Sequence, residues 1–314
     1  TPSLTPSKHI LGGRLVRMAS SSESRSSRGV KQLLCGGLAG CAARTTTAPI
    51  DRTKILLQTQ HLSMPAGAAP KYTGIVQTLS TVVKEEGPLA LFRGNLVNCI
   101  RVFPYSGCQF VFFDLFKGAI SQLGGNDATQ AKLNVPQRLT ASACAQVVAT
   151  TVTHPLDLLR LRLAVYRELG GSIPKAAASV WSEGGVVAFY KGLFPTIVSV
   201  APFGAINFTC YDTIKGHVQP TSSLSVGACG AASAMIATSI CYPLDVVRRR
   251  MQLKGTTYKS TMDAFSTIVR EEGVLGLYKG QLANLLKTVP NNAVRFIAFE
   301  FLKKLVKMEK RHTD

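Results

Sequence analysis

Long stretches without charged residues dominate the hydropathy pattern of the chain. Residues 192–211 and 224–244 contain no Asp, Glu, Lys or Arg, and residues 139–156 add only one histidine. Each is long enough to cross a bilayer as a helix, which takes about 20 residues. Residues 32–50, 94–113 and 280–299 are similar in length but carry one or two basic residues each. We therefore predict six membrane-spanning helices.

The six stretches belong to three copies of one pattern. A Pro-x-Asp-x-x-basic motif begins at Pro49, Pro155 and Pro243. A second proline follows in each copy, and these prolines are 98 and 88 residues apart (202 − 104 and 290 − 202). An aromatic-acidic pair follows at constant spacing in the three copies, at Phe113-Asp114, Tyr211-Asp212 and Phe299-Glu300. A repeat of this kind indicates a fold built from three similar units.

Each copy predicts the same order of elements: a long helix with a proline near its end, a polar loop, a short helix and a second long helix. The first copy is eight residues longer between its prolines, and we assign the excess to residues 64–70. The short element carries an acidic-Gly pair, as at Glu86-Gly87 and Glu272-Gly273. Gly184-Gly185 takes that place in the second copy, which puts a contact from such an acid in doubt there.

We place the three repeats at residues 30–125, 136–218 and 222–308. Residues 1–29 form a separate Ser-rich segment with a strong excess of basic over acidic residues. This bias is typical of an organellar transit segment, and a disordered basic tail is the alternative.

Composition leaves two classes open, since 46% of the residues are hydrophobic while the net charge is +19. A basic soluble protein and a membrane protein both fit these values. The uncharged stretches favour the membrane protein, and the basic residues gather at helix ends and loops with no nucleic-acid-binding motif, so we expect no nucleic-acid partner. The eight cysteines contain no C-x-x-C pair and fall in or beside the predicted spans. Buried small hydrophobes explain them better than a metal site, and no cofactor is expected.

Taken together, these residues resemble the mitochondrial carrier family from about Val30 to Met308. The carrying features are the three Pro-x-Asp-x-x-basic motifs, the aromatic-basic-Gly triplets and the three aromatic-acidic-x-x-basic motifs. The resemblance implies an all-α membrane protein with six transmembrane helices in three pseudo-threefold repeats and short amphipathic helices. It also implies a central cavity that opens alternately to either side, and a transporter rather than an enzyme.

The resemblance assigns two gates to the charged motifs. The matrix-side or stroma-side gate pairs Asp51 with Arg160, Asp157 with Arg248 and Asp245 with Lys54. Gln58 and Gln252 match the bracing glutamines of that gate, whereas Ala164 takes the position in the second repeat. The alternative is that these charges lie on the surface and cap helix ends.

The cytosol-side gate is expected to pair Asp114 with Lys215, Asp212 with Lys303 and Glu300 with Lys117. Acidic and basic residues three positions apart also stabilise single helices, which is the simpler interpretation. The same spacing occurs three times in register with the other landmarks, and this favours a gate.

Four charged residues lie inside the predicted spans, and all are basic: Arg44, Arg101, Lys287 and Arg295. A charge at that depth costs on the order of 3 kcal/mol on insertion scales, so each is a candidate functional residue. Phosphate is the anion that Arg and Lys recognise best. Arg295 or Arg101 could instead extend to the lipid headgroups.

Within the family, Arg101 and Lys287 match the first and third substrate contact points, and Ser199-Val200 match the second. Phe203, one turn later, offers a stacking face for a purine. Arg249 and Arg250 are expected to face substrate or lipid phosphate. The resemblance is strongest to adenine-nucleotide carriers, in particular plant thylakoid ADP/ATP carriers that also handle the sulfonucleotide PAPS. The alternatives are a coenzyme A or adenosine phosphosulfate carrier and, in another class, a structural subunit or proton leak.

Partners and location follow from the same resemblance. An acidic lipid such as cardiolipin is expected at the helix starts Arg93-Gly94, Lys191-Gly192 and Lys279-Gly280. One chain supplies all three repeats, so a monomer is expected to suffice. A chloroplast thylakoid or envelope membrane is favoured, with the mitochondrial inner membrane as the alternative.

Overall fold

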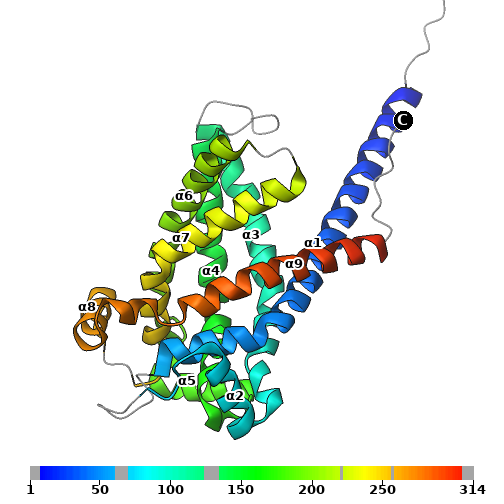
Figure 1. The fold of residues 1–314 in the computed structure, drawn as a ribbon. Helices are drawn as coiled ribbons and strands as arrows, with labels where there is room; N and C mark the ends of the chain where they lie inside the picture. Colours follow the sequence, from blue (N-terminus) through cyan, green and yellow to red (C-terminus); the bar gives the residue numbers. More distant parts are fainter. Residues whose placement is uncertain (1–7, 61–69, 124–133, 220–221, 256–257, 306–314) are drawn as a thin grey trace, which may run out of the picture.

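The computed structural model describes residues 8–60, 70–123, 134–219, 222–255 and 258–305. These residues form helices in an order that repeats three times, long, short and long (Figure 1). The helices of the first repeat are α1 (Lys8–Thr59), α2 (Ile75–Glu86) and α3 (Asn95–Leu123); those of the second are α4 (Val135–Val165), α5 (Ile173–Ala188) and α6 (Leu193–Val218); those of the third are α7 (Ser223–Met251), α8 (Thr261–Glu272) and α9 (Gln281–Leu305). The predicted order of elements is confirmed.

The motif prolines lie inside the long helices rather than at their ends. Helix α1 continues past Pro49 to Thr59, and α4 continues past Pro155 to Val165. Helix α1 is also continuous across the predicted boundary between residues 29 and 30, which stays a prediction. Most of the stretch to which we assigned the longer first loop lies outside the described residues.

Long helices of neighbouring repeats pack side by side. The closest pairs are α3 with α4, α6 with α7, and α9 with α1, and the last pair closes the ring between the ends of the chain. The short helices α2, α5 and α8 gather at one end of the molecule (Figure 1). The long helices therefore surround a central space that has the short helices at one end.

Each short helix packs on the first long helix of its own repeat. Val180 of α5 joins Leu158 and Leu163 of α4 in one buried cluster, and Ile268 of α8 joins the corresponding residues of α7. Helices α2 and α8 end at the predicted glycines Gly87 and Gly273, whose φ angles are positive. These contacts fix the positions of the segments that follow the motif prolines in α4 and α7.

The glycine of each aromatic-basic-Gly triplet permits a close approach between repeats. Gly94 has a φ of +79°, and a Cβ atom there would lie 2.7 Å from the backbone oxygen of Arg160 in α4. A side chain at this position would push the start of α3 away from α4. The charged motif of one repeat is thereby kept against the helix start of the preceding one.

The outer faces of the long helices are apolar. Phe194 of α6 and Phe296, Ile297 and Phe301 of α9 are each more than 60% exposed. In the described part of the chain, α6 and residues 225–251 of α7 are long and apolar enough to cross a membrane by length and composition. The other four long helices carry more charge, and several of these charges, together with Asp245, Arg248 and Arg249 of α7, build the site.

Candidate substrate cavity and gates

Three ion pairs close the central space at the short-helix end. Arg160 Nη2 lies 3.0 Å from Asp51 Oδ2, and Lys54 Nζ lies 2.6 Å from Asp245 Oδ2. Arg248 donates a hydrogen bond to Asp157. These six residues, which we call the inner ring, come from α1, α4 and α7, and each pair joins two repeats. The pairings are those that the family resemblance implies.

Each inner-ring carboxylate also contacts a second cation. Lys287 Nζ lies 2.5 Å from Asp51 Oδ1, and Arg101 Nη1 lies 2.8 Å from Asp157 Oδ2. Arg249 Nε lies 3.4 Å from Asp245 Oδ2. Arg101 and Lys287, predicted only as substrate contacts, are therefore bound to the gate in this conformation. The sequence pattern could not reveal this, because α3 and α9 reach these carboxylates only through tertiary packing.

The inner ring and its additional cations carry an excess of positive charge. Six cationic side chains surround three carboxylates, which leaves a net charge of +3 (6 − 3). In the described structure, Nε of Arg101 and Nε of Arg248 are buried and have no hydrogen-bond acceptor. Buried donors of this kind are costly unless they are satisfied. The site is therefore suited to accept an anion.

The two predicted bracing glutamines differ. Gln58 Nε2 donates to the Tyr242 hydroxyl at 2.9 Å and lies 3.5 Å from Asp245 Oδ2, so it supports the Lys54–Asp245 pair. Gln252 is buried, but its Nε2 has no acceptor in the described structure. The bracing contact expected from Gln252 is absent in this conformation.

A second set of arginines ties the repeats together beneath the inner ring. Nε of Arg52, Arg162 and Arg250 each donates to a backbone oxygen of another repeat, at 3.2, 2.9 and 3.1 Å. The acceptors are Ala164, Gln252 and Gln58, the three positions seven residues after the motif Asp. These links form a closed circuit through the three repeats.

Each of these arginines is held by an acid of a short helix. Arg52 pairs with Glu86 at 2.7 Å, Arg162 with Glu183 at 2.5 Å, and Arg250 with Glu272. Arg250 is 1% exposed, so the expectation that it faces substrate or lipid was wrong. Arg249, its neighbour, lines the central cavity as expected.

Glu183 supplies the acid contact that the sequence pattern left in doubt for the second repeat. It binds Arg162 through both oxygens and lies 3.4 Å from Lys191. Eight residues separate Glu183 from Lys191, whereas seven separate Glu86 from Arg93 and Glu272 from Lys279. The extra glycine concealed the equivalence. Hydrogen bonds from Arg162 hold the pKa of Glu183 below its usual value.

The opposite end of the molecule has no such closure. The residues predicted for the cytosol-side gate, here called the outer ring, are Asp114, Lys117, Asp212, Lys215, Glu300 and Lys303. Among these described residues the structure contains one ion pair, Lys303 with Glu300 at 3.7 Å, within α9. Asp114, Lys117, Asp212 and Lys215 are exposed. The interhelical pairs expected there are not formed, so the structure is closed at the inner ring only.

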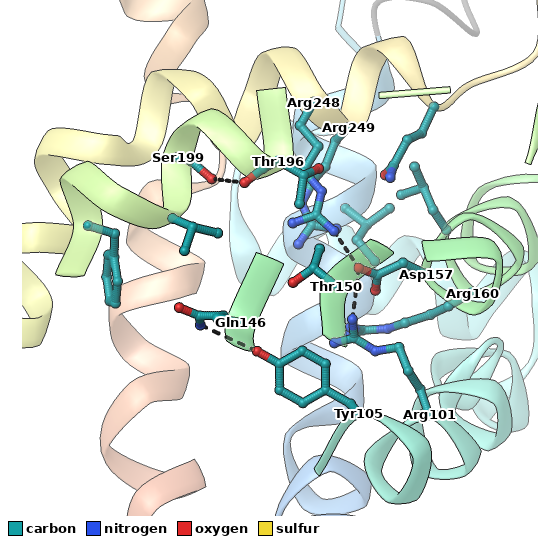
Figure 2. A pocket seen from close by; sticks show the side chains of 15 residues that line it. Arg101, Tyr105, Gln146, Thr150, Asp157, Arg160, Thr196, Ser199, Arg248 and Arg249 are labelled. Atoms are coloured by element: carbon teal, nitrogen blue, oxygen red, sulfur yellow. Dashed lines mark hydrogen bonds and ion pairs between the residues drawn. The ribbon is translucent and has the colours of Figure 1, made fainter. Parts of the chain in front are cut away.

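A polar pocket of about 250 Å³ lies directly above the inner ring (Figure 2). Arg101, Arg160, Arg248 and Arg249 supply its positive charge, and among the described residues Asp157 is its one acidic lining residue. The α6 residues predicted for the second contact point line the same pocket, namely Ser199, Val200 and Phe203. The pocket therefore combines guanidinium donors with an uncharged wall.

Tyr105 and Gln146 complete the pocket, and sequence reasoning missed both. Gln146 Nε2 donates to the Tyr105 hydroxyl at 3.3 Å, and the Arg101 guanidinium lies 5.5 Å from the Tyr105 ring centroid. Tyr105 follows Arg101 by four residues, one helical turn, which is the available signal. The pair connects α3 to α4 across the pocket (Figure 2).

The remaining predicted cations, Arg44 and Arg295, line a second cavity of about 850 Å³. Arg44 Nη1 donates to the backbone oxygen of Asn98 at 3.3 Å. Among the described residues no group of three or more His, Cys, Asp or Glu side chains could hold a metal ion.

Comparisons with known proteins agree with this geometry. Residues 25–123, 131–222 and 219–310 match the family model described as mitochondrial carrier protein. The chain is 43% identical over 279 residues to a chloroplastic thylakoid ADP,ATP carrier protein of Arabidopsis thaliana, covering 86% of this chain and 64% of that protein. A probable chloroplastic envelope ADP,ATP carrier of the same plant is 41% identical over 280 residues, covering 86% and 70%. The mitochondrial adenine nucleotide transporter ADNT1, also from Arabidopsis thaliana, is 35% identical over 322 residues, covering 90% and 89%. The chain spans about two thirds of the length of the first two relatives.

Proposed function

Because the chain belongs to the mitochondrial carrier family, whose members are transporters of organellar membranes, we propose that it exchanges adenine nucleotides by alternating access. Three relatives named above are adenine nucleotide carriers, two of chloroplast membranes and one of mitochondria. The observation that carries the proposal is the net +3 charge around the three inner-ring carboxylates, next to a pocket lined by Ser199 and Phe203.

Arg101 and Lys287 couple substrate binding to the inner ring. Each now occupies an oxygen of a gate carboxylate, Asp157 or Asp51. A nucleotide phosphate competes for both cations, because arginine and lysine form charge-assisted hydrogen bonds to phosphate and carboxylate alike. Each carboxylate then retains one partner instead of two. The inner ring is weakened at the moment when substrate is bound.

Ion pairs are suited to a gate because their formation is nearly balanced. Desolvation offsets much of the attraction between buried charges, so opening costs little when a substrate takes over the contacts. The substrate drives the change only through its different affinity for the two states. In the alternate state the outer ring pairs Asp114 with Lys215, Asp212 with Lys303 and Glu300 with Lys117, while the inner-ring pairs separate.

The adenine end of the substrate is assigned to the α6 wall of the pocket. Ser199 is small, and its hydroxyl donates to the Thr196 backbone oxygen at 2.7 Å, so this donor is satisfied without a ligand. Val200 and Phe203 present apolar surfaces to a purine on the same side. Arg44 and Arg295 lie farther from the inner ring and contact the ligand on its way through the cavity.

The lipid contacts are proposed at the starts of α3, α6 and α9. The basic residues there already bind acids of the short helices: Arg93–Glu86 at 2.5 Å, Lys191–Glu183 at 3.4 Å and Lys279–Glu272 at 2.5 Å. Acidic lipid headgroups are therefore bound mainly by the free backbone N–H groups of the helix starts. The transporter works as a monomer, since its cavity is complete within one chain.

Liposome reconstitution tests the proposed function. We expect uptake of ADP, ATP or PAPS into liposomes preloaded with a nucleotide, and none into protein-free liposomes. Coenzyme A and adenosine 5′-phosphosulfate belong in the same panel because both share the adenine and phosphate groups. Preference for either would reassign the substrate while keeping the transport mechanism. Absence of exchange with every compound would favour a structural subunit, and proton flux without exchange would favour a leak.

The membrane is proposed to be that of a chloroplast, thylakoid or envelope, on the strength of the two chloroplastic relatives. Import of the full-length precursor into isolated chloroplasts and mitochondria, followed by fractionation, tests this. Recovery in the mitochondrial inner membrane alone would contradict it.

A further inference from the structure

The larger cavity contains an arginine that the proposed exchange mechanism does not use. The cavity measures about 850 Å³ and shares Tyr105 with the polar pocket above the inner ring. Its three charged lining residues, Arg44, Arg138 and Arg295, come from α1, α4 and α9, and no Asp or Glu is among the lining residues. Its volume lies in the range that holds a drug-sized ligand.

Arg138 is available to a ligand. It lies in the first turn of α4 and is exposed, and within the described residues neither Arg138 nor Arg295 makes an ion pair or a side-chain hydrogen bond. Phe110, Phe113 and Phe208 line the same cavity and offer apolar faces. Three arginines with no facing carboxylate make a field that attracts anions.

Arg138 is not part of the threefold framework. It precedes Pro155 by 17 residues, and the corresponding residues of the first and third repeats are Gln32 and Val226. Likewise, Arg295 follows Pro290 by five residues, where the other repeats have Gln109 and Asn207. A framework role would require similar residues in the three repeats. These charges instead serve an asymmetric ligand.

The position of Arg138 separates it from the inner ring. Asp157 follows Arg138 by 19 positions along α4 (157 − 138), which at about 1.5 Å per residue corresponds to about 28 Å. A mononucleotide whose phosphates contact Arg101 and Arg160 cannot also reach Arg138. The contact with Arg138 must therefore be made at another stage of transport.

We propose that Arg138, with Arg44 and Arg295 in the same cavity, forms an outer station that captures the phosphate groups of the substrate before they reach the inner ring. The inference rests on the proposed nucleotide exchange. Arg138 speeds the association of the substrate with the cavity, because a positively charged wall raises the local concentration of an anion and its rate of association. Arg44 and Arg295 then receive the phosphates nearer to the inner ring.

The test is uptake kinetics in vesicles of phosphatidylcholine alone. In Arg138→Gln, which introduces the residue of the first repeat, we expect KM for ADP to rise by about three- to tenfold at low salt with kcat unchanged. The difference from the unaltered protein should shrink in about 0.5 M salt, where the Debye length falls below about 5 Å. Arg138→Lys keeps the positive charge, so its KM for ADP should stay close to that of the unaltered protein. Arg270→Gln, on the exposed face of α8, is the matched control and should match the unaltered protein.

Three outcomes would overturn the proposal. An unchanged KM in Arg138→Gln would mean that no capture occurs there, and a loss of kcat with KM unchanged would indicate a structural role. A defect that appears only when acidic lipid is added to the vesicles would identify Arg138 as a headgroup contact. Uptake by the unaltered protein separates failure of this inference from failure of the proposed function. If the unaltered protein takes up nucleotide, these outcomes rule out only the outer station. If it takes up no nucleotide, the proposed exchange function fails as well.

Discussion

Lys287 of α9 places its Nζ 2.5 Å from Oδ1 of Asp51 in α1, although 236 residues separate the two in the chain. The other oxygen of Asp51 binds Arg160 at 3.0 Å. One carboxylate thus holds a cation of the gate and a cation assigned to the substrate. A phosphate that draws Lys287 away removes half of the support of that carboxylate. In the proposed mechanism, this shared contact links substrate binding to opening of the inner ring.

Lys287→Met should strongly reduce nucleotide exchange while leaving the protein folded. Hydrogen bonds to charged groups contribute about 1.5–3 kcal/mol, and the loss of one phosphate contact of this size corresponds to a decrease of about 10- to 100-fold in uptake at subsaturating substrate. Asp51 retains Arg160, so the unfolding temperature should change little. The measurement is initial uptake together with a thermal unfolding curve.

Arg101→Gln provides the companion experiment, because Arg101 holds Asp157 as Lys287 holds Asp51. A similar loss of uptake is expected. Undiminished uptake in both variants would place the substrate site elsewhere, whereas aggregation of both would show that these cations hold the helices together.

Asp51→Asn should destabilise the conformation that is closed at the inner ring. Its carboxylate is 11% exposed and contacts both Arg160 and Lys287. Removing one partner of a buried ion pair costs on the order of 3 kcal/mol. We expect a lower unfolding temperature and lower exchange. Asp114→Asn is the matched control for stability alone, because Asp114 is exposed and, among the described residues, makes no interhelical ion pair. Its proposed role in the outer ring excludes it as a control for exchange. Equal loss of stability in the two variants would contradict the assignment of this state.

Glu183→Gln should destabilise the protein about as much as Glu86→Gln. Arg162, which is 1% exposed, binds both oxygens of Glu183 and would lose its carboxylate. We expect a loss on the order of 3 kcal/mol from leaving this guanidinium without its charge partner. Glu168→Gln, at an exposed position in the same repeat, is the control. An unfolding curve for Glu183→Gln that matches this control would show that the second repeat does not use its acid.

The contribution of Glu183 should also depend on pH. Its pKa is held below the usual value by the hydrogen bonds from Arg162, so its stabilising effect is fully present above the carboxyl pKa of the unfolded chain, about 4.3. The effect is lost as the pH falls through the folded pKa. The difference in unfolding temperature between the unaltered protein and Glu183→Gln should therefore shrink below about pH 4. A difference that is constant from pH 7 to pH 3.5 would indicate that packing, not charge, accounts for it.

The repeated order of helices and the membership of the inner ring could be predicted from the sequence. Pro49, Pro155 and Pro243 fix the register of three equivalent helices, and an Asp two residues later and a basic residue three residues after that stay one helical turn apart wherever the helix lies. Local periodicity places the Asp and the basic residue of each motif on one helix face, because 3.6 residues per turn is a property of the backbone. The pairing of these charges across repeats, and the assignment of Ser199, Val200 and Phe203 to the substrate site, were implied by the resemblance to the mitochondrial carrier family.

Which charges share a partner was decided only by the tertiary structure. Arg101 and Lys287 meet Asp157 and Asp51 because α3 and α9 pack beside helices of other repeats, and no spacing along the chain encodes those distances. The extra glycine before Lys191 hid Glu183 from a pattern that counts residues, although folding restores its contact with Arg162. Residue spacing along the chain is enough to predict three symmetric sets of charges, because the repeats share one helical register. The packing of the helices determines that the inner-ring pairs are formed, that the interhelical pairs of the outer ring are not, and that Arg101 and Lys287 contact inner-ring carboxylates.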